Sequence, residues 1–180
     1  MGAARHVVLA TLILAVAPAC QDGAILAKYG SAMPEFPDQC EGGRHPGVDF
    51  RAPTGSSVLA SANGVVLSVR TTKSGGGVLL IWHEEFDRYT AYAHLDWPLT
   101  PPEIGEEVVR GQIIGRVGMF RNSGSSPHVH LELCMEPCVW GHPSCYLEGT
   151  ENPLRNSDGC FDEEAVYSEH LLVLTYPVPC

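Results

Sequence analysis

The sequence predicts an all-β protein with an irregular tail, on three observations. There are 19 glycines and 14 prolines in 180 residues, which favours a turn-rich β protein over a helical bundle. Short apolar runs recur at a spacing of roughly ten residues, which fits an antiparallel sheet, a sandwich or a barrel-like fold. Apolar residues make up 44% and charged residues 18% of the chain, so a sizeable core is expected and disorder is not. The length indicates one domain.

The strands are expected where apolar runs lie between turn signals. Asn63-Gly64 is a tight-turn signal between two of these runs. In the tail, residues 162–170 are a candidate short helix and residues 171–176 a candidate final strand. The predicted strands are residues 57–60, 65–69, 78–82, 89–94, 108–109, 113–117 and 129–133.

Residues 1–19 have the pattern of a secretory signal peptide. A basic start with Arg5 is followed by 13 apolar or small residues, 7–19, which end on Ala17-Pro18-Ala19. This run is too short to span a bilayer as a helix. We therefore expect an exported protein, located in the periplasm, at the cell surface or in the medium.

The seven cysteines fit an exported protein, because disulfides persist in oxidising compartments. Cys20 directly follows the cleavage pattern and resembles the lipidated cysteine of bacterial lipoproteins. If it is lipidated, the chain is attached to a membrane and an even number of cysteines remains; if it is not, one thiol is left over. For the cluster Cys134-x3-Cys138-x6-Cys145, disulfides are favoured over a structural zinc. Residues 135–180 are thus expected to form a disulfide-rich extension packed on the domain.

The charge balance argues against nucleic acid as a partner. The chain has 21 acidic and 11 basic residues and a formal net charge of −10 at pH 7. Such a chain lacks the basic surface that a phosphate backbone requires, so we expect no nucleic-acid partner.

Histidines and an aspartate occur at spacings that suit a metal site. His128 and His130 are two residues apart in a predicted strand, which places both imidazoles on one face. His45 and Asp49 flank Pro46-Gly47, where a bend could bring an imidazole and a carboxylate onto one ion. Nitrogen and oxygen donors of this kind suit zinc. From the residues alone, either histidine of the pair could be the ligand.

Three segments follow one another along the chain: H-x-x-x-D at 45–49, Y-x-H-L at 92–95 and H-x-H-L-E at 128–132. In this order they resemble the lysostaphin/LytM-type zinc metalloendopeptidases, a family of peptidoglycan peptidases. Residues 45–69 are also similar to the family's first motif with its following β-hairpin. Residues 104–118 are similar to its turn-and-strand stretch.

The resemblance divides the mature chain into three parts. It covers residues 42–134 and leaves residues 20–41 as a short N-terminal lead-in. The loop at 119–127 is longer than the usual loop of the family, and the extension at 135–180 has no counterpart in it.

The resemblance implies a twisted antiparallel β-sheet or sandwich, the duplicated hybrid motif fold, with a groove and one zinc ion per chain. By similarity, His45, Asp49 and His130 would be the zinc ligands. His94 and His128 would be catalytic. The substrate implied is a peptide of bacterial peptidoglycan, in a stem or a cross-bridge, and we expect a monomer.

Two other functions stay open. One is a non-catalytic LytM-type regulator that activates a cell-wall amidase, and the other is a zinc-bearing binding or signalling module. Degenerate relatives lack one or more of the polar residues just named. All of them are present here, which favours the enzyme.

Overall fold

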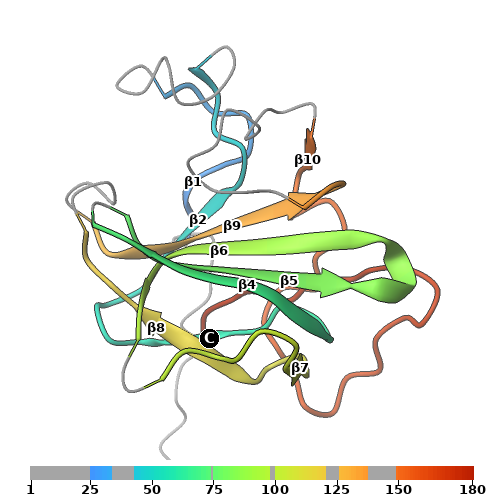
Figure 1. The fold of residues 1–180 in the computed structure, drawn as a ribbon. Helices are drawn as coiled ribbons and strands as arrows, with labels where there is room; N and C mark the ends of the chain where they lie inside the picture. Colours follow the sequence, from blue (N-terminus) through green and yellow to red (C-terminus); the bar gives the residue numbers. More distant parts are fainter. Residues whose placement is uncertain (1–24, 34–42, 74, 98–99, 121–125, 138–148) are drawn as a thin grey trace, which may run out of the picture.

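The computed structural model describes residues 25–33, 43–73, 75–97, 100–120, 126–137 and 149–180. In these ranges the chain is nearly all β, with ten strands and one short 3-10 helix (Figure 1), which confirms the predicted class. The predicted signal peptide and Cys20 lie outside the described residues, as do Cys138 and Cys145. Within the described part, no helix is long and apolar enough to cross a membrane.

The strands form one antiparallel sheet with a smaller ribbon joined to it. The main path runs β1-β2-β9-β6-β5-β4-β7, β10 extends β9, and β3 pairs with β8, which also joins β6. The elements are β1 (Ile25–Ala27), β2 (Val48–Arg51), β3 (Ser57–Leu59), β4 (Gly64–Thr72), β5 (Gly76–His83), η3 (Glu84–Phe86), β6 (Arg88–Asp96), β7 (Glu107–Val108), β8 (Ile113–Val117), β9 (His128–Cys134) and β10 (Thr150–Glu151).

β9 has a polar face and an apolar face, because successive side chains of a strand point to opposite sides. Val129 and Leu131 are buried in the main hydrophobic core, whereas His128 and His130 project from the other face. β3 and β8 pack against the apolar face and close the core. The largest members of this core are Phe50, Leu79, Ile81, Tyr92, Leu95, Ile114 and Leu131.

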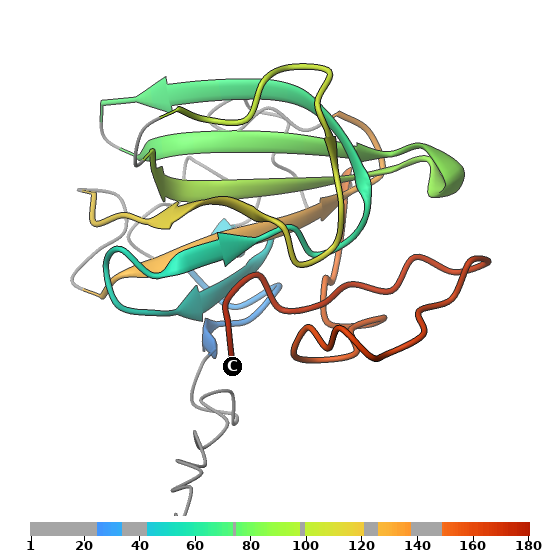
Figure 2. The ribbon, with the colours of Figure 1, turned by 90° about the horizontal axis from the view of Figure 1, so that it is seen from below.

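The described part of the C-terminal extension packs on the apolar face of the sheet. Figure 2 shows residues 149–180 running along one side of the strands. Leu174 is buried in a cluster with Leu133 of β9, and the ring of Tyr176 lies 5.0 Å from that of Phe50 in β2. The extension therefore supports the sheet from the side opposite the imidazoles.

Polar contacts and a disulfide hold the extension in place. Arg110 donates hydrogen bonds to the carbonyls of Ser61 (2.6 Å) and Val173 (2.7 Å), so one guanidinium ties the tail to the bend before β4. A disulfide joins Cys160 to Cys180.

Two sequence predictions for the tail are wrong. Residues 162–170 are mostly irregular, with a turn at 163–164 and a bend at 169–170, and form no helix. The Asp162 carboxylate accepts a hydrogen bond from the Glu164 N–H, which favours a local turn over a helical one. Residues 171–176 are not a strand and contain only an isolated bridge at Leu174. The backbone of this segment is held by isolated hydrogen bonds instead of a ladder, from the Leu174 N–H to the carbonyl of Asn156 and from the Thr175 N–H to that of Ser61.

The predicted turn at Asn63-Gly64 is a bend that does not make a hairpin. β3 pairs with β8, whereas β4 pairs with β5 and β7. Gly64 meets a different requirement, since a Cβ there would lie 2.5 Å from the carbonyl oxygen of Trp82. The glycine permits close approach of two backbones rather than a tight turn.

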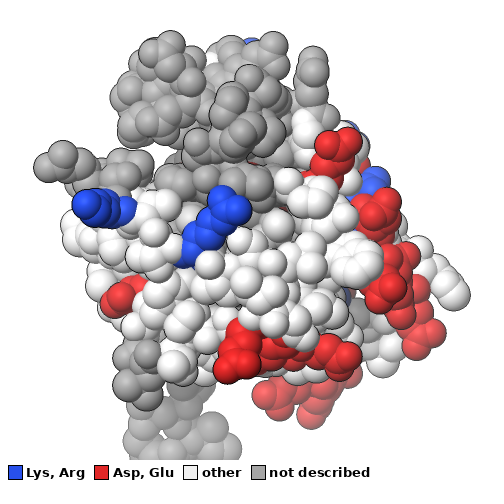
Figure 3. All heavy atoms as spheres, in the orientation of Figure 1, with Lys and Arg blue, Asp and Glu red and all other residues white. Residues whose placement is uncertain are grey.

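The surface reflects the acidic composition. In the view of Figure 3, most Asp and Glu side chains gather along the lower and right margins, and the few Lys and Arg side chains are scattered and form no cluster. A polyanion would find no continuous basic surface on this face.

Candidate metal centre

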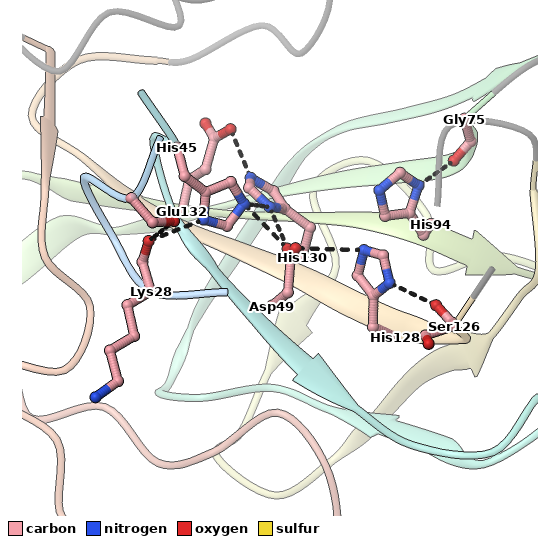
Figure 4. Close-up of polar contacts among 10 residues, drawn as sticks. Lys28, His45, Asp49, Gly75, His94, Ser126, His128, His130 and Glu132 are labelled. Atoms are coloured by element: carbon pink, nitrogen blue, oxygen red, sulfur yellow. Dashed lines mark hydrogen bonds and ion pairs between the residues drawn. The ribbon is translucent and has the colours of Figure 1, made fainter. Parts of the chain in front are cut away.

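Three neighbouring strands bring together polar side chains that are far apart in the sequence (Figure 4). In the β2–β9 pair, Asp49 lies directly opposite His130, and in the β6–β9 pair Ala93 lies opposite the same residue. The register therefore places the H-x-x-x-D, Y-x-H-L and H-x-H segments around one point. The side chains that meet there are His45, Asp49, His94, His128 and His130.

His45, Asp49 and His130 form the tightest part of this group. His45 Nε2 lies 3.0 Å from His130 Nδ1 and 3.2 Å from Asp49 Oδ1, and His130 Nδ1 lies 2.8 Å from the same oxygen. The bend at Gly47 permits this approach, because a Cβ there would lie 2.3 Å from the carbonyl oxygen of Leu131. The bend thus brings the imidazole of His45 and the carboxylate of Asp49 into contact.

This donor set fits a metal ion. The three residues offer ligand atoms that all lie within 4.8 Å of one another. Bonds of about 2.0–2.1 Å in a tetrahedron set neighbouring donors about 3.3 Å apart, close to the separations found here. Two imidazole nitrogens and a carboxylate oxygen are also the ligand types of catalytic zinc sites that leave one position open.

The electrostatics favour a positive charge at this point. Burial opposes ionisation of Asp49, but hydrogen bonds from His130 and His45 outweigh it and hold the pKa of the carboxyl well below its usual range. Burial lowers the pKa of His130, yet its hydrogen bonds to Asp49 and Glu132 prevail and raise the pKa to about 10. The carboxylates therefore create a site that attracts a proton or a cation.

Second partners fix which nitrogen of each ligand candidate faces the centre. His45 Nδ1 lies 3.3 Å from the carbonyl oxygen of Lys28, which leaves Nε2 toward Asp49. His130 is turned the other way, since its Nε2 lies 2.9 Å from Glu132 Oε1 and its Nδ1 faces the centre. Neither Lys28 nor Glu132 was predicted from the sequence to be a functional residue. A signal for Glu132 was available, because 128, 130 and 132 continue the same two-residue spacing.

His94 and His128 lie beside this group as a second pair. Their ring centroids are 4.8 Å apart, and His128 Nε2 lies 3.7 Å from Asp49 Oδ2. The Nδ1 atoms are held by backbone carbonyls, at 3.1 Å from Gly75 for His94 and 2.8 Å from Ser126 for His128. Each Nδ1–H then donates to a carbonyl, so each ring presents Nε2 as the atom that can exchange a proton.

Burial and the charges of His130 and His128 lower the pKa of His94 to about 4. The His94 ring is therefore neutral at pH 7. A neutral imidazole with Nδ1 occupied can accept a proton at Nε2.

A backbone irregularity turns His94 toward this centre. In an unbroken strand Tyr92 and His94 would share a face, yet Tyr92 is fully buried in the core. The β5–β6 register shifts between Leu79 and Gly77, and His94 adopts a left-handed conformation with φ of 63°. At this point β6 also changes partner from β9 to β8. The resulting bulge moves His94 to the polar face and returns Leu95 to the core.

His83 takes no part in this cluster. Its Nδ1 lies 2.6 Å from the carbonyl oxygen of Asn63 and its Nε2 lies 2.8 Å from Thr90 Oγ1. Both ring nitrogens thus have protein partners within the fold. The residue is a buried structural histidine.

Comparison with known proteins identifies relatives of this chain. The model of Peptidase family M23 matches residues 43–137. Peptidoglycan DD-endopeptidase ShyA of Vibrio cholerae is 37% identical over 91 residues, which cover 49% of this chain and 20% of ShyA. Murein hydrolase activator NlpD of Salmonella dublin is 30% identical over 112 residues, which cover 62% of this chain and 26% of NlpD. The chain thus corresponds to a small part of the length of each relative.

Solved structures agree with this result. The catalytic domain of lysostaphin from Staphylococcus simulans matches with a TM-score of 0.55 and 24% identity, over 71% of this chain and 86% of that domain. A zinc-containing peptidase from Vibrio cholerae matches with a TM-score of 0.51 and 30% identity, over 63% of this chain and 34% of that one. The lysostaphin-like fold and the resemblance predicted from the motifs are confirmed. Because the family match spans more than half of the sequence, the chain belongs to peptidase family M23.

Proposed function

We propose that this protein is a zinc-dependent endopeptidase that hydrolyses peptide bonds in bacterial peptidoglycan. The observation that carries the proposal is the meeting of three metal donors with two further imidazoles on one face of the sheet. The similarity to an endopeptidase named for peptidoglycan and to a zinc-containing peptidase supports the choice of metal and substrate.

In this proposal His45, Asp49 and His130 hold one zinc ion, through Nε2, a carboxylate oxygen and Nδ1 respectively. Bound there, zinc would polarise the scissile carbonyl and lower the pKa of a bound water. The single carboxylate leaves the site with a net charge of +1, which suits that chemistry.

His94 and His128 move the protons. One ring, neutral at the start, accepts the proton of the attacking water at Nε2. The other ring starts as the imidazolium and donates its Nε2 proton to the developing oxyanion or the leaving amine. The carbonyls of Gly75 and Ser126 accept the Nδ1–H of the two rings, so Nε2 is the atom of each ring that exchanges a proton. The low pKa of His94 keeps this ring unprotonated at neutral pH, so His94 is suited to the role of acceptor.

Location and substrate support each other. The proposed export signal would carry the chain to the compartment that contains peptidoglycan. The acidic surface offers no electrostatic attachment to an anionic wall, so the lipidated form of Cys20 is one proposed means of retention there.

The test uses the full mature chain and the variant His128→Ala. We expect the wild type to bind about one zinc per chain and to release new amino groups from purified peptidoglycan. The variant should keep the zinc and lose about two or more orders of magnitude in rate, because a proton-transfer group is gone while the three donors remain. His170→Ala, an exposed histidine of the tail, serves as the matched control. Hydrolysis that survives His128→Ala would refute the assignment, and mass spectrometry of the released muropeptides names the bond.

The similarity to NlpD favours one second candidate, a non-catalytic activator of a cell-wall amidase. Under this alternative the wild type would release no amino groups by itself. It would instead stimulate a purified amidase on the same peptidoglycan, and His128→Ala would stimulate it equally well.

A further inference from the structure

Glu132 is a buried carboxylate in an apolar environment. Only 1% of the residue is exposed. It lies opposite Ala91 of β6, next to a small hydrophobic cluster that contains Leu80, Ala91 and Cys134. A carboxylate in such surroundings is costly unless a strong hydrogen-bond partner compensates it.

The partner is the ring of His130. Glu132 Oε1 lies 2.9 Å from His130 Nε2, and its other oxygen has Cys134 Sγ at 3.9 Å (Figure 4 shows the contact with His130). Because residues 130 and 132 share one face of β9, the strand itself holds the two groups in register. Glu132 approaches the nitrogen that points away from Asp49.

This contact determines what the other nitrogen can do. When Nε2–H donates to Glu132, Nδ1 carries the lone pair and faces His45 Nε2 and Asp49 Oδ1. A carboxylate behind an imidazole also fixes the ring's orientation and makes the facing nitrogen a better ligand. Neither effect requires Glu132 to touch a metal or a substrate.

We propose that Glu132 is a positioning residue, which holds His130 with Nδ1 directed at the metal site and so raises metal affinity. The proposal rests on the proposed function, in which His130 is a zinc ligand.

Two variants of similar volume separate the hydrogen bond from the charge. Glu132→Gln keeps an acceptor for Nε2–H and loses the charge, whereas Glu132→Leu removes both. Zinc affinity of the full mature chain is measured by competition with a chromophoric chelator, and the absorption spectrum of the Co²⁺-loaded chain reports on ligand geometry. We expect zinc binding about 10- to 100-fold weaker in Glu132→Leu, with a shifted Co²⁺ spectrum, and an intermediate loss in Glu132→Gln.

Glu151→Gln is the matched control, because this half-exposed carboxylate on β10 pairs with Arg88 away from the centre and should leave affinity unchanged. Wild-type affinity and an unshifted Co²⁺ spectrum in Glu132→Leu would overturn the proposal. If circular dichroism shows that Glu132→Leu does not fold, Glu132→Gln decides alone: weaker zinc binding supports the role and wild-type binding overturns it.

Failure of the peptidase proposal can be distinguished from failure of the Glu132 proposal. A wild type that binds zinc and hydrolyses nothing would refute the peptidase, while the order of zinc affinities would still decide the role of Glu132. A wild type that binds no zinc would overturn both.

Discussion

At the scale of single residues, His94 combines an orientation toward the candidate metal centre with an unfavourable backbone conformation. Its φ of 63° lies in the left-handed region, which costs a residue with a side chain about 1–2 kcal/mol relative to glycine. In the part of the chain that the structure describes, Asp87 is the other non-glycine residue with positive φ, and it follows the 3-10 helix η3. Strain of this kind persists where the surrounding contacts fix the conformation, and it gathers at functional sites.

Replacement of His94 tests this strain. His94→Gly should be about 1 kcal/mol more stable to unfolding than His94→Ala, because both lose the ring but only glycine tolerates the left-handed conformation. Urea denaturation of the two variants measures the difference. At the neighbouring position 93, where the backbone does not have a positive φ, alanine should be the more stable residue. Ala93→Gly should therefore lower the free energy of unfolding by about 0.5–1 kcal/mol. An alanine variant as stable as the glycine variant would contradict the assignment of strain.

The residue types of the site were predictable, but their orientation was not. The two-residue spacing of His128 and His130 fixed their common face, because strand geometry alone determines it. The same rule applied to Tyr92 and His94 places them on one face, which is wrong here because a bulge intervenes. The choice of Nδ1 in His130 depends on Glu132, and in His45 on the carbonyl of Lys28, so it follows from contacts and not from spacing.

At the scale of elements, the candidate site depends on strands that are far apart in the sequence and are brought together by pairing in the sheet. β1, in the predicted lead-in, pairs with β2, and the carbonyl of Lys28, just after β1, orients His45.

His83 connects three other strands by polar contacts. It lies at the end of β5 and contacts the Asn63 carbonyl before β4 and Thr90 of β6. Thr90 Oγ1 in turn lies 3.3 Å from the Tyr92 hydroxyl.

The His83 contact makes stability depend on pH. Burial lowers the pKa of His83 from 6.5 to about 4, and the hydrogen bond to Asn63 only partly offsets it. Between these values the unfolded chain binds a proton that the folded chain does not, so stability falls as pH decreases from about 6.5 toward 4. From pH 7 to pH 5 this group should lower the free energy of unfolding by about 2 kcal/mol.

The measurement compares wild type with His83→Gln, which cannot titrate in this range. Urea denaturation at pH 7 and pH 5, with the same metal content in both proteins, should show the larger loss in the wild type. Equal losses in the two proteins would mean that His83 is not the group responsible.

At the scale of the whole molecule, the C-terminal extension is part of the fold and not an appendage. Its aliphatic and aromatic side chains complete the core behind the site, and Arg110 and the Cys160–Cys180 disulfide fasten it. The sequence predicted a disulfide-rich extension but placed a helix and a strand in it. Its conformation follows from long-range contacts, such as that of Leu174 with Leu133, and local patterns do not contain them.

Removal of this disulfide should affect stability without affecting the metal site. Cys160→Ser with Cys180→Ser opens a loop with a sequence separation of 20, which should lower the free energy of unfolding by about 3 kcal/mol. Zinc affinity should stay at the wild-type value, because the extension packs on the opposite face of the sheet. Urea denaturation and zinc titration provide the two measurements. Val166→Ser, at a fully exposed position of the same tail, should change neither stability nor zinc affinity. A loss of zinc binding in the double variant would contradict the view that the extension supports the fold independently of the proposed metal site.

The alternation of side chains along β9 limits how the length of this strand can change. Insertion or deletion of one residue within His128–Cys134 would reverse the parity of every later position. Imidazoles would then enter the hydrophobic core, and aliphatic side chains would occupy the place of the proposed metal ligands. Length variation in descendants of this sequence is therefore expected outside β9, or within it only in steps of two.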